Sequence, residues 1–173
     1  MMRLLLLSAA LLAIGQAAHA QTIKDIEGEE TKLEALWQSM PLTLHRSLFI
    51  TGDPAAYGMY TERATRTFKP GEPLLIYVEP VGYRWKDEGN GLFSFGISAD
   101  ALILDKSRKV IGGKEEIAHK LYRSHVRNKE LMLTLRLNLT GAVAGDYIAE
   151  YRLHDLISGQ TTTAELPFTI SAE

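Results

Sequence analysis

Histidine is the residue type best suited to bind a transition metal in this chain, because the sequence contains no cysteine. His119 and His125 are six residues apart, a spacing that suits neither one face of a helix nor neighbouring same-face positions of a strand. His154 is followed by Asp155, so the two point to opposite faces if they lie in a strand, and His45 stands alone. We therefore predict no metal site.

The serines and carboxylates show no catalytic pattern. Ser98 has a glycine on one side only, in Phe95-Gly96-Ile97-Ser98-Ala99, and so lacks the Gly-x-Ser-x-Gly elbow of a serine hydrolase. A hydrolase with two carboxylates needs both acids to face one cleft. Four acids are candidates, and their spacing does not decide whether any two share a cleft: Glu79, Asp100, Asp105 and Asp155. We expect them to cap turns or to pair with arginine, and we predict that the chain is not an enzyme.

The glycine-rich points are Gly112-Gly113 and Gly89-Asn90-Gly91. Both lack the lysine, the following helix and the fixed spacing of a phosphate-binding loop. The oxygen-rich segment 87–90 does not have the ligand spacing of a calcium loop. We predict turns at these positions and no bound cofactor.

Tyr83-Arg84-Trp85 combines two aromatic rings and a guanidinium within a polar, glycine-spaced segment, residues 82–91. That composition is enriched where protein surfaces bind partners. Tyr57 and Tyr60 could join it if the loops cluster at one end of the fold. These five residues are the candidate binding site for a partner or ligand. The alternative is that Trp85 folds back onto the core or onto a helix at residues 31–40.

Residues 1–20 have the pattern of a secretory signal peptide. Arg3 precedes an apolar run that starts at Leu4, and the segment closes on Ala18-His19-Ala20. The alternative, an uncleaved membrane anchor, needs about 20 apolar residues, and this run is shorter. We predict cleavage after Ala20, export to the periplasm or beyond, and a soluble mature chain without stable membrane insertion.

Cleavage leaves 153 residues, enough for one domain with a real core. It also removes Arg3 from a formal net charge of −2, which leaves −3. This mild negative balance argues against a nucleic-acid partner and against binding to anionic membranes. The absence of cysteine excludes disulfides, thiol nucleophiles, iron–sulfur clusters and a lipid-anchored cysteine.

The segment 21–41 is predicted to hold a loose polar lead-in and one short amphipathic helix. The helix is expected over residues 31–40, with a cap at Thr31, Glu34 three residues on, and Pro41 at its end. One apolar face at spacings of three and four unites Leu33, Leu36, Trp37 and Met40.

From residue 42 onward the apolar period changes to two, which predicts strands. They are expected at 44–50, 74–79, 93–103, 131–139, 147–153 and 164–170. The run 93–103 is long enough to need a bend near Gly96 or Asp100. A hairpin turn at 105–109 leads into Val110-Ile111, which Gly112-Gly113 is expected to end. Residues 114–128 could be a short helix or an irregular crossover.

Many short strands with turns between them predict an all-β domain over residues 42–173, and an antiparallel sandwich rather than a barrel. Tyr147 follows the Leu-rich strand 131–139 and a short corner. In immunoglobulin-type sandwiches a tyrosine there donates its hydroxyl back across the corner, two residues before a cysteine. Here that second position is Ala149.

Three segments carry a resemblance: Lys69-Pro70-Gly71-Glu72-Pro73-Leu74, Tyr77 to Gly82, and the closing segment Gly145 to Ile170. With Leu42 and Phe49 they resemble small exported proteobacterial proteins that have an immunoglobulin-like β-sandwich and no characterised activity. The resemblance spans roughly residues 36–170 and implies a fold and a compartment, with no catalytic residue.

The function we expect is a non-catalytic binding module of the cell envelope, with an N-terminal helix packed against the sandwich. Its partner would be another envelope protein, bound through loops or an exposed strand edge. The alternative is a module that binds carbohydrate or a small ligand with the aromatic rings of Tyr83 and Trp85. A periplasmic hydrolase comes third.

Overall fold

A computed structural model of the chain describes residues 21–172, so the predicted signal peptide at residues 1–20 lies outside the described residues. The described chain begins with one helix, α1 (Ile23–Ser39), and continues as strands. Their bounds are β1 Thr43–Phe49, β2 Thr67–Phe68, β3 Leu74–Val81, β4 Lys86–Gly89, β5 Leu92–Asp105, β6 Val110–Ser124, β7 Leu133–Leu137, β8 Gly145–Asp155 and β9 Thr161–Ile170.

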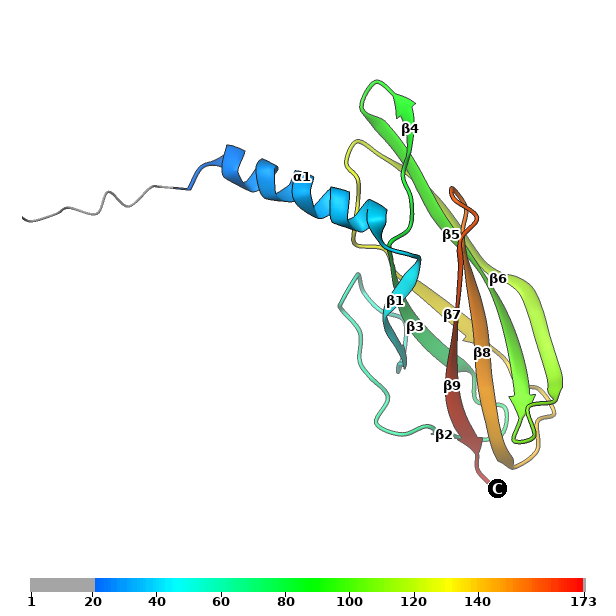
Figure 1. Cartoon of the computed structure of the whole chain (residues 1–173). Helices are drawn as coiled ribbons and strands as arrows, with labels where there is room; N and C mark the ends of the chain where they lie inside the picture. Colours follow the sequence, from blue (N-terminus) through cyan, green and yellow to red (C-terminus); the bar gives the residue numbers. More distant parts are fainter. Residues whose placement is uncertain (1–20, 173) are drawn as a thin grey trace, which may run out of the picture.

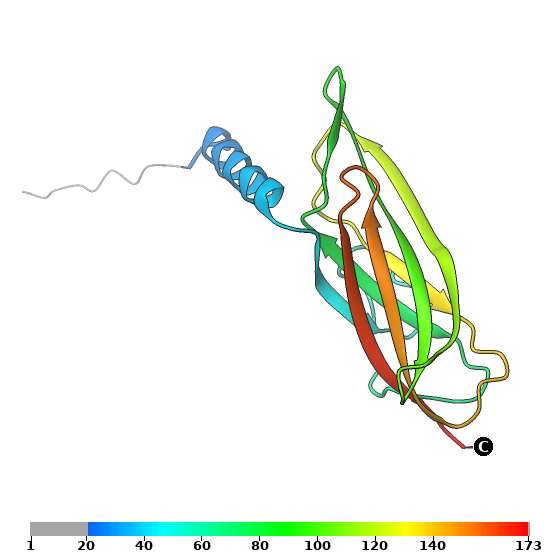
Figure 2. The ribbon, with the colours of Figure 1, turned by 45° about the vertical axis from the view of Figure 1, so that its right-hand side comes forward.

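The strands form two sheets (Figures 1 and 2). The smaller has the order β1-β3-β7, and the larger has the order β2-β9-β8-β5-β4, with β6 paired to β5. Neighbours are antiparallel, except that the short β2 runs parallel to β9. The prediction of an all-β domain with antiparallel sheets is therefore confirmed.

One hydrophobic core joins the inner faces of both sheets. The alternation predicted for the closing strands is present, because Tyr147, Ala149, Tyr151 and Leu153 of β8 are all buried. Leu133, Leu135 and Leu137 of β7 belong to the same core from the other sheet. Burying each such large apolar side chain contributes roughly 1.5–3 kcal/mol before entropy is counted, so this face decides the strand register.

The corner before β8 is closed by Tyr147. Its hydroxyl donates to the carbonyl oxygen of Val143 at 2.8 Å, and its ring stacks on Phe168 with centroids 5.6 Å apart. The predicted back-bond across the corner is confirmed.

β6 corrects two predictions. It runs without a break from Val110 to Ser124, so Gly112-Gly113 do not end a strand, and most of 114–128 is neither helix nor crossover. Within residues 21–172 the strand pairs only with β5, and nearly all of its side chains are exposed. Neither face is buried enough to impose an apolar period, which explains why the pattern was missed.

The prediction for segment 82–91 also needs correction. Its first half, from Gly82 to Trp85, is largely buried, and its second half is β4, which forms a hairpin with β5. The turn predicted at Gly89-Asn90-Gly91 is confirmed: Asn90 and Gly91 have φ of 54° and 70°, as a type I′ hairpin turn requires. The bend predicted in β5 stays a prediction, because the register shift opposite Ala99 and Ala101 lies on β6 and β5 pairs with β8 without a shift.

α1 is longer than predicted, because residues 21–30 are not a loose lead-in. The helix is capped by Thr22, whose backbone N–H and hydroxyl donate to Asp25 Oδ2 at 2.7 and 2.8 Å. Thr31, the predicted cap, lies mid-helix and donates its hydroxyl to the carbonyl of Glu27. Within residues 21–172 no helix has the length and apolar character needed to cross a bilayer.

Candidate interaction surface

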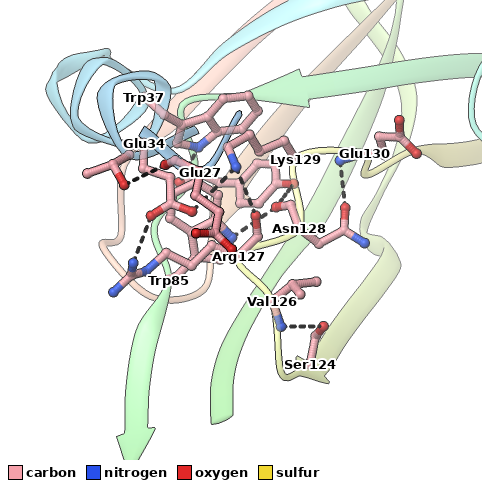
Figure 3. A network of polar contacts seen from close by, with 12 residues as sticks. Glu27, Glu34, Trp37, Trp85, Ser124, Val126, Arg127, Asn128, Lys129 and Glu130 are labelled. Carbon is pink, nitrogen blue, oxygen red and sulfur yellow. Dashed lines mark hydrogen bonds and ion pairs between the residues drawn. The ribbon is translucent and has the colours of Figure 1, made fainter. Parts of the chain in front are cut away.

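Three aromatic rings fasten the last turn of α1 to the β-body. The Trp37 ring stacks on Trp85 with centroids 5.5 Å apart and meets Tyr83 edge-on at 5.2 Å. Trp37 Nε1 donates to the carbonyl oxygen of Tyr83 at 2.8 Å (Figure 3). Trp37 is the one residue of α1 that is buried.

The predicted binding platform is therefore a packing site. Tyr83 is completely buried and Trp85 is 9% exposed. Both side chains donate to the carbonyl oxygen of Asn128, each at 2.9 Å. Burial raises the pKa of the Tyr83 hydroxyl above its ordinary value. The alternative, in which Trp85 folds back onto the core and the helix, is the arrangement found, so these two rings offer no surface to a carbohydrate.

Arg84 closes the C-terminal end of α1. Its guanidinium donates to the carbonyl oxygens of Gly82 at 2.5 Å and Met40 at 3.1 Å, and its backbone N–H donates to Asp155 Oδ2 at 2.9 Å. A cation at this end satisfies carbonyls that lack helical partners and opposes the negative end of the helix dipole. Arg84 thus positions the helix.

Ion pairs join the same end of α1 to the loop after β6. Glu34 accepts from Arg127 Nη1 at 2.7 Å and lies 3.5 Å from Lys129 Nζ (Figure 3). The Arg127 guanidinium also lies over the Phe93 ring, 4.4 Å from its centroid. Solvent screens these partly exposed pairs, so they orient the helix more than they stabilise it.

Beyond this anchor, α1 projects away from the β-body (Figures 1 and 2). Four large apolar side chains remain exposed along it: Ile23 at 67%, Ile26 at 55%, Leu33 at 46% and Leu36 at 58%. The expectation that the predicted face packs against the sandwich is wrong for Leu33 and Leu36. Sequence reasoning missed Ile23 and Ile26, although the interval of three residues between them and of seven residues from Ile26 to Leu33 places all three on one helical face.

Tyr57 and Tyr60 lie elsewhere, against the outer face of the smaller sheet. The Tyr60 ring packs on Tyr77 with centroids 4.3 Å apart. Burial and the nearby Glu79 carboxylate raise the pKa of Tyr57. Because Trp85 is buried, Tyr57 and Tyr60 do not form one exposed surface with it.

A buried carboxylate organises the site beside Tyr57. Glu79 is 2% exposed; it accepts from the Tyr77 hydroxyl at 2.8 Å and pairs with His45 Nδ1 at 2.9 Å. Tyr77 in turn accepts from the backbone N–H of Gly58 at 2.8 Å, so the cluster pins the loop that follows β1. Burial and Glu79 together raise the pKa of Tyr77 to about 12. His45, which the sequence left isolated, is oriented by this acid.

Two of the remaining candidate acids cap turns, as was expected for acids at strand ends. Asp105 accepts from the backbone N–H groups of Ser107 and Lys109. Asp155 is 1% exposed and accepts from Ile157 N and Ser158 Oγ, and so closes the β8–β9 turn.

Asp100 instead holds two neighbouring strands to β5. Its carboxylate accepts from the backbone N–H of Glu116 at 2.9 Å and pairs with His154 Nε2 at 2.7 Å. Ser98 lies beside both His119 and His154 in the strand register, yet no hydrogen bond joins it to either ring among the described residues. Residues 21–172 contain no group of three His, Asp or Glu side chains able to hold a metal ion.

A hollow lies between β6 and the segment after β7. It has a volume of about 770 Å³, and Ile103, Ile117, Leu139 and Tyr147 are among its lining residues. No histidine lines it, and Asp105, its one carboxylate, already caps a turn. It does not assemble an acid and a base for hydrolysis.

The sequence matches no known protein-family model and no curated protein. The exposed apolar stripe of α1 therefore has to be interpreted from its own geometry.

Proposed function

We propose that this chain is an exported, non-catalytic binding module of the bacterial cell envelope, and that α1 is its docking arm. The exported location rests on the signal-peptide pattern of residues 1–20. The partner would be another envelope protein. The resemblance to exported proteobacterial proteins is consistent with this compartment.

An immunoglobulin-like β-sandwich is the body we propose for this module. The sheet orders β1-β3-β7 and β9-β8-β5-β6 support it, as does the Tyr147 hydrogen bond across the corner before β8. Ala149 takes the place of the inter-sheet cysteine, so packing alone would hold the sheets together.

The observation that carries the proposal is the exposure of apolar side chains along a helix that, among the described residues, contacts its own domain only at one end. Isolated helices shorter than about 12–15 residues are marginal in water, and most helices gain their stability by packing an apolar face. The part of α1 before Leu33 has no such packing within the described chain. A surface that combines exposed Ile and Leu with a helical scaffold is typical of a helix that docks into a partner.

Cross-linking in the native envelope tests this. Replacing Ile26 and Leu33 by serine should abolish the cross-linked partner, because the apolar contacts are removed. The matched control replaces Lys24 and Lys32 by serine, since both are exposed residues of the same helix. Both variants should keep the unfolding midpoint of the parent, because none of the four side chains is buried. Equal capture by the two variants would refute a docking role for α1.

A further inference from the structure

We infer that the surface which receives α1 is a basic amphipathic helix, packed along the apolar stripe in the manner of a two-stranded coiled coil. This rests on the proposed function of α1 as a docking arm, and it adds the chemical class of the partner.

One line of residues along α1, which includes three of its four exposed apolar side chains, has heptad spacing. Ile23, Ile26, Glu30, Leu33 and Trp37 follow one another at intervals of three, four, three and four residues. These are the a and d positions of a coiled-coil seam. Trp37 is held by the β-body, so the seam that a partner can reach runs from Ile23 to Leu33, where the apolar side chains are 46–67% exposed.

Acidic residues border this seam on both sides. Glu27 and Glu34 occupy the e positions and Glu29 a g position, while Glu30 interrupts the seam itself. The two lysines of the helix, Lys24 and Lys32, fall on positions away from the seam. Glu34 is already paired with Arg127 and Lys129 of the body.

Three acids therefore remain for a partner: Glu27, Glu29 and Glu30 are all exposed. Glu29 has an ion pair with Lys32 at 2.7 Å, but both side chains are 73% exposed, and such surface pairs are weak and easily exchanged. A partner helix with Lys or Arg along its edges, and one cation opposite Glu30, would satisfy all three. Charges at these positions set partner choice in coiled coils.

A second copy of this chain is a poor occupant. In a parallel pair of α1 helices, Glu29 would lie near Glu34 of the other copy and the two Glu30 side chains would meet in the seam. In an antiparallel pair, e positions face e positions and g positions face g positions, so acidic residues again face acidic residues. Like charges at these positions repel, and a buried carboxylate without a partner is costly. An anionic membrane surface is also disfavoured, because α1 has five acidic residues and only two basic ones.

The test uses two labelled synthetic helices and the exported chain. Both peptides have Ile and Leu at the seam positions; one has Lys at the flanking positions and opposite Glu30, and the other has Glu there. Fluorescence anisotropy should show the basic peptide binding at least about tenfold more tightly, and its affinity should fall as NaCl rises from about 50 to about 500 mM. Amide exchange of residues 23–33 should slow when it binds.

Charge reversal identifies the groups responsible. Glu27→Lys, Glu29→Lys and Glu30→Lys together should reverse the preference, so that the acidic peptide binds better. The control, Glu62→Lys, Glu115→Lys and Asp146→Lys, makes the same change in net charge at exposed positions of the β-body and should keep the preference for the basic peptide.

The two proposals fail in different ways. The basic-helix partner is refuted if both peptides bind equally, or if the affinity does not change with salt or with charge reversal. In that case, loss of envelope cross-linking in the Ile26 and Leu33 variant would still support a docking arm. If that apolar variant keeps its envelope partner, the docking arm itself is refuted.

Discussion

At the scale of single residues, Tyr147 combines a buried ring with one well-placed hydroxyl. Tyr147→Phe keeps the ring contact with Phe168 but leaves the Val143 carbonyl without its donor. We expect the free energy of unfolding to fall by about 1 kcal/mol, the usual net value of such a bond. Urea denaturation measures it. Tyr122→Phe, a change at a 39% exposed residue, should have almost no effect, and equal losses in the two variants would contradict the corner's role.

The ionisation of Asp100 should make the free energy of unfolding depend on pH. The Glu116 N–H, and after it His154, lower the pKa of the Asp100 carboxyl. A lowered pKa stabilises the fold above the carboxyl's ordinary value of about 3.9, and this contribution is lost as the pH falls through the folded value. Asp100→Asn should therefore cost about 1–2 kcal/mol at neutral pH and progressively less below about pH 4.

Urea midpoints at neutral and acidic pH check this expectation. Asp53→Asn is the control, because Asp53 pairs with Arg136 at the surface with its side chain 70% exposed; its cost should stay below about 1 kcal/mol. A penalty at Asp100 that did not change with pH would show that the ionised carboxylate is not the stabilising form.

Residue type alone did not reveal the role of Tyr83 and Trp85. Their composition is that of a binding loop, and the sequence left this interpretation open beside one in which Trp85 folds back onto the core or the helix. The outcome depended on Trp37, whose indole N–H bonds to Tyr83 from 46 residues away. Local spacing does not contain such a contact, so the same aromatic residues can form either a surface or a core.

At the scale of elements, the sequence predicted correctly those strands that bury one face in the core. The strands at 147–153 and 164–170 were predicted because one face of each is buried and imposes a period of two. β6 was missed because both its faces are largely exposed. The first half of α1 was missed because it packs against no other element of the part of the chain that the structure describes. Periodicity reports a buried face, and elements without one leave little pattern.

The attachment of α1 should depend on one side chain. Trp37→Ala removes the stack on Trp85 and the bond to Tyr83, and we expect a loss of about 3 kcal/mol or more in the free energy of unfolding, with faster amide exchange along α1. Leu36→Ala, one residue earlier and 58% exposed, is the control and should change stability by less than about 0.5 kcal/mol. Similar losses in both would place the helix anchor elsewhere.

At the scale of the whole molecule, the larger sheet ends on a long open strand, yet the proposed partner site lies on α1. Features of β6 explain why this open edge is not the proposed partner site. Its 15 residues could template pairing with another chain, but they include Lys114, Lys120 and Arg123, and a bulge where Glu116 adopts φ of 49°. Charges and bulges on an edge strand discourage edge-to-edge association. The open edge is thus protected against strand pairing, although β6 also exposes Val110, Ile111 and Leu121. The partner site is proposed on α1 because its exposed apolar side chains follow one another along a projecting helix.

That protection can be removed by substitution. Lys120→Val with Arg123→Val replaces two exposed charges of β6 by residues that favour strand pairing, and we expect concentration-dependent self-association in sedimentation velocity. The control, Lys69→Val with Lys106→Val, removes the same charge from exposed turn positions and should sediment like the parent. If the β6 variant also behaved as the parent at every concentration, the bulge at Glu116 would be sufficient to block pairing, and the charges would have no protective role.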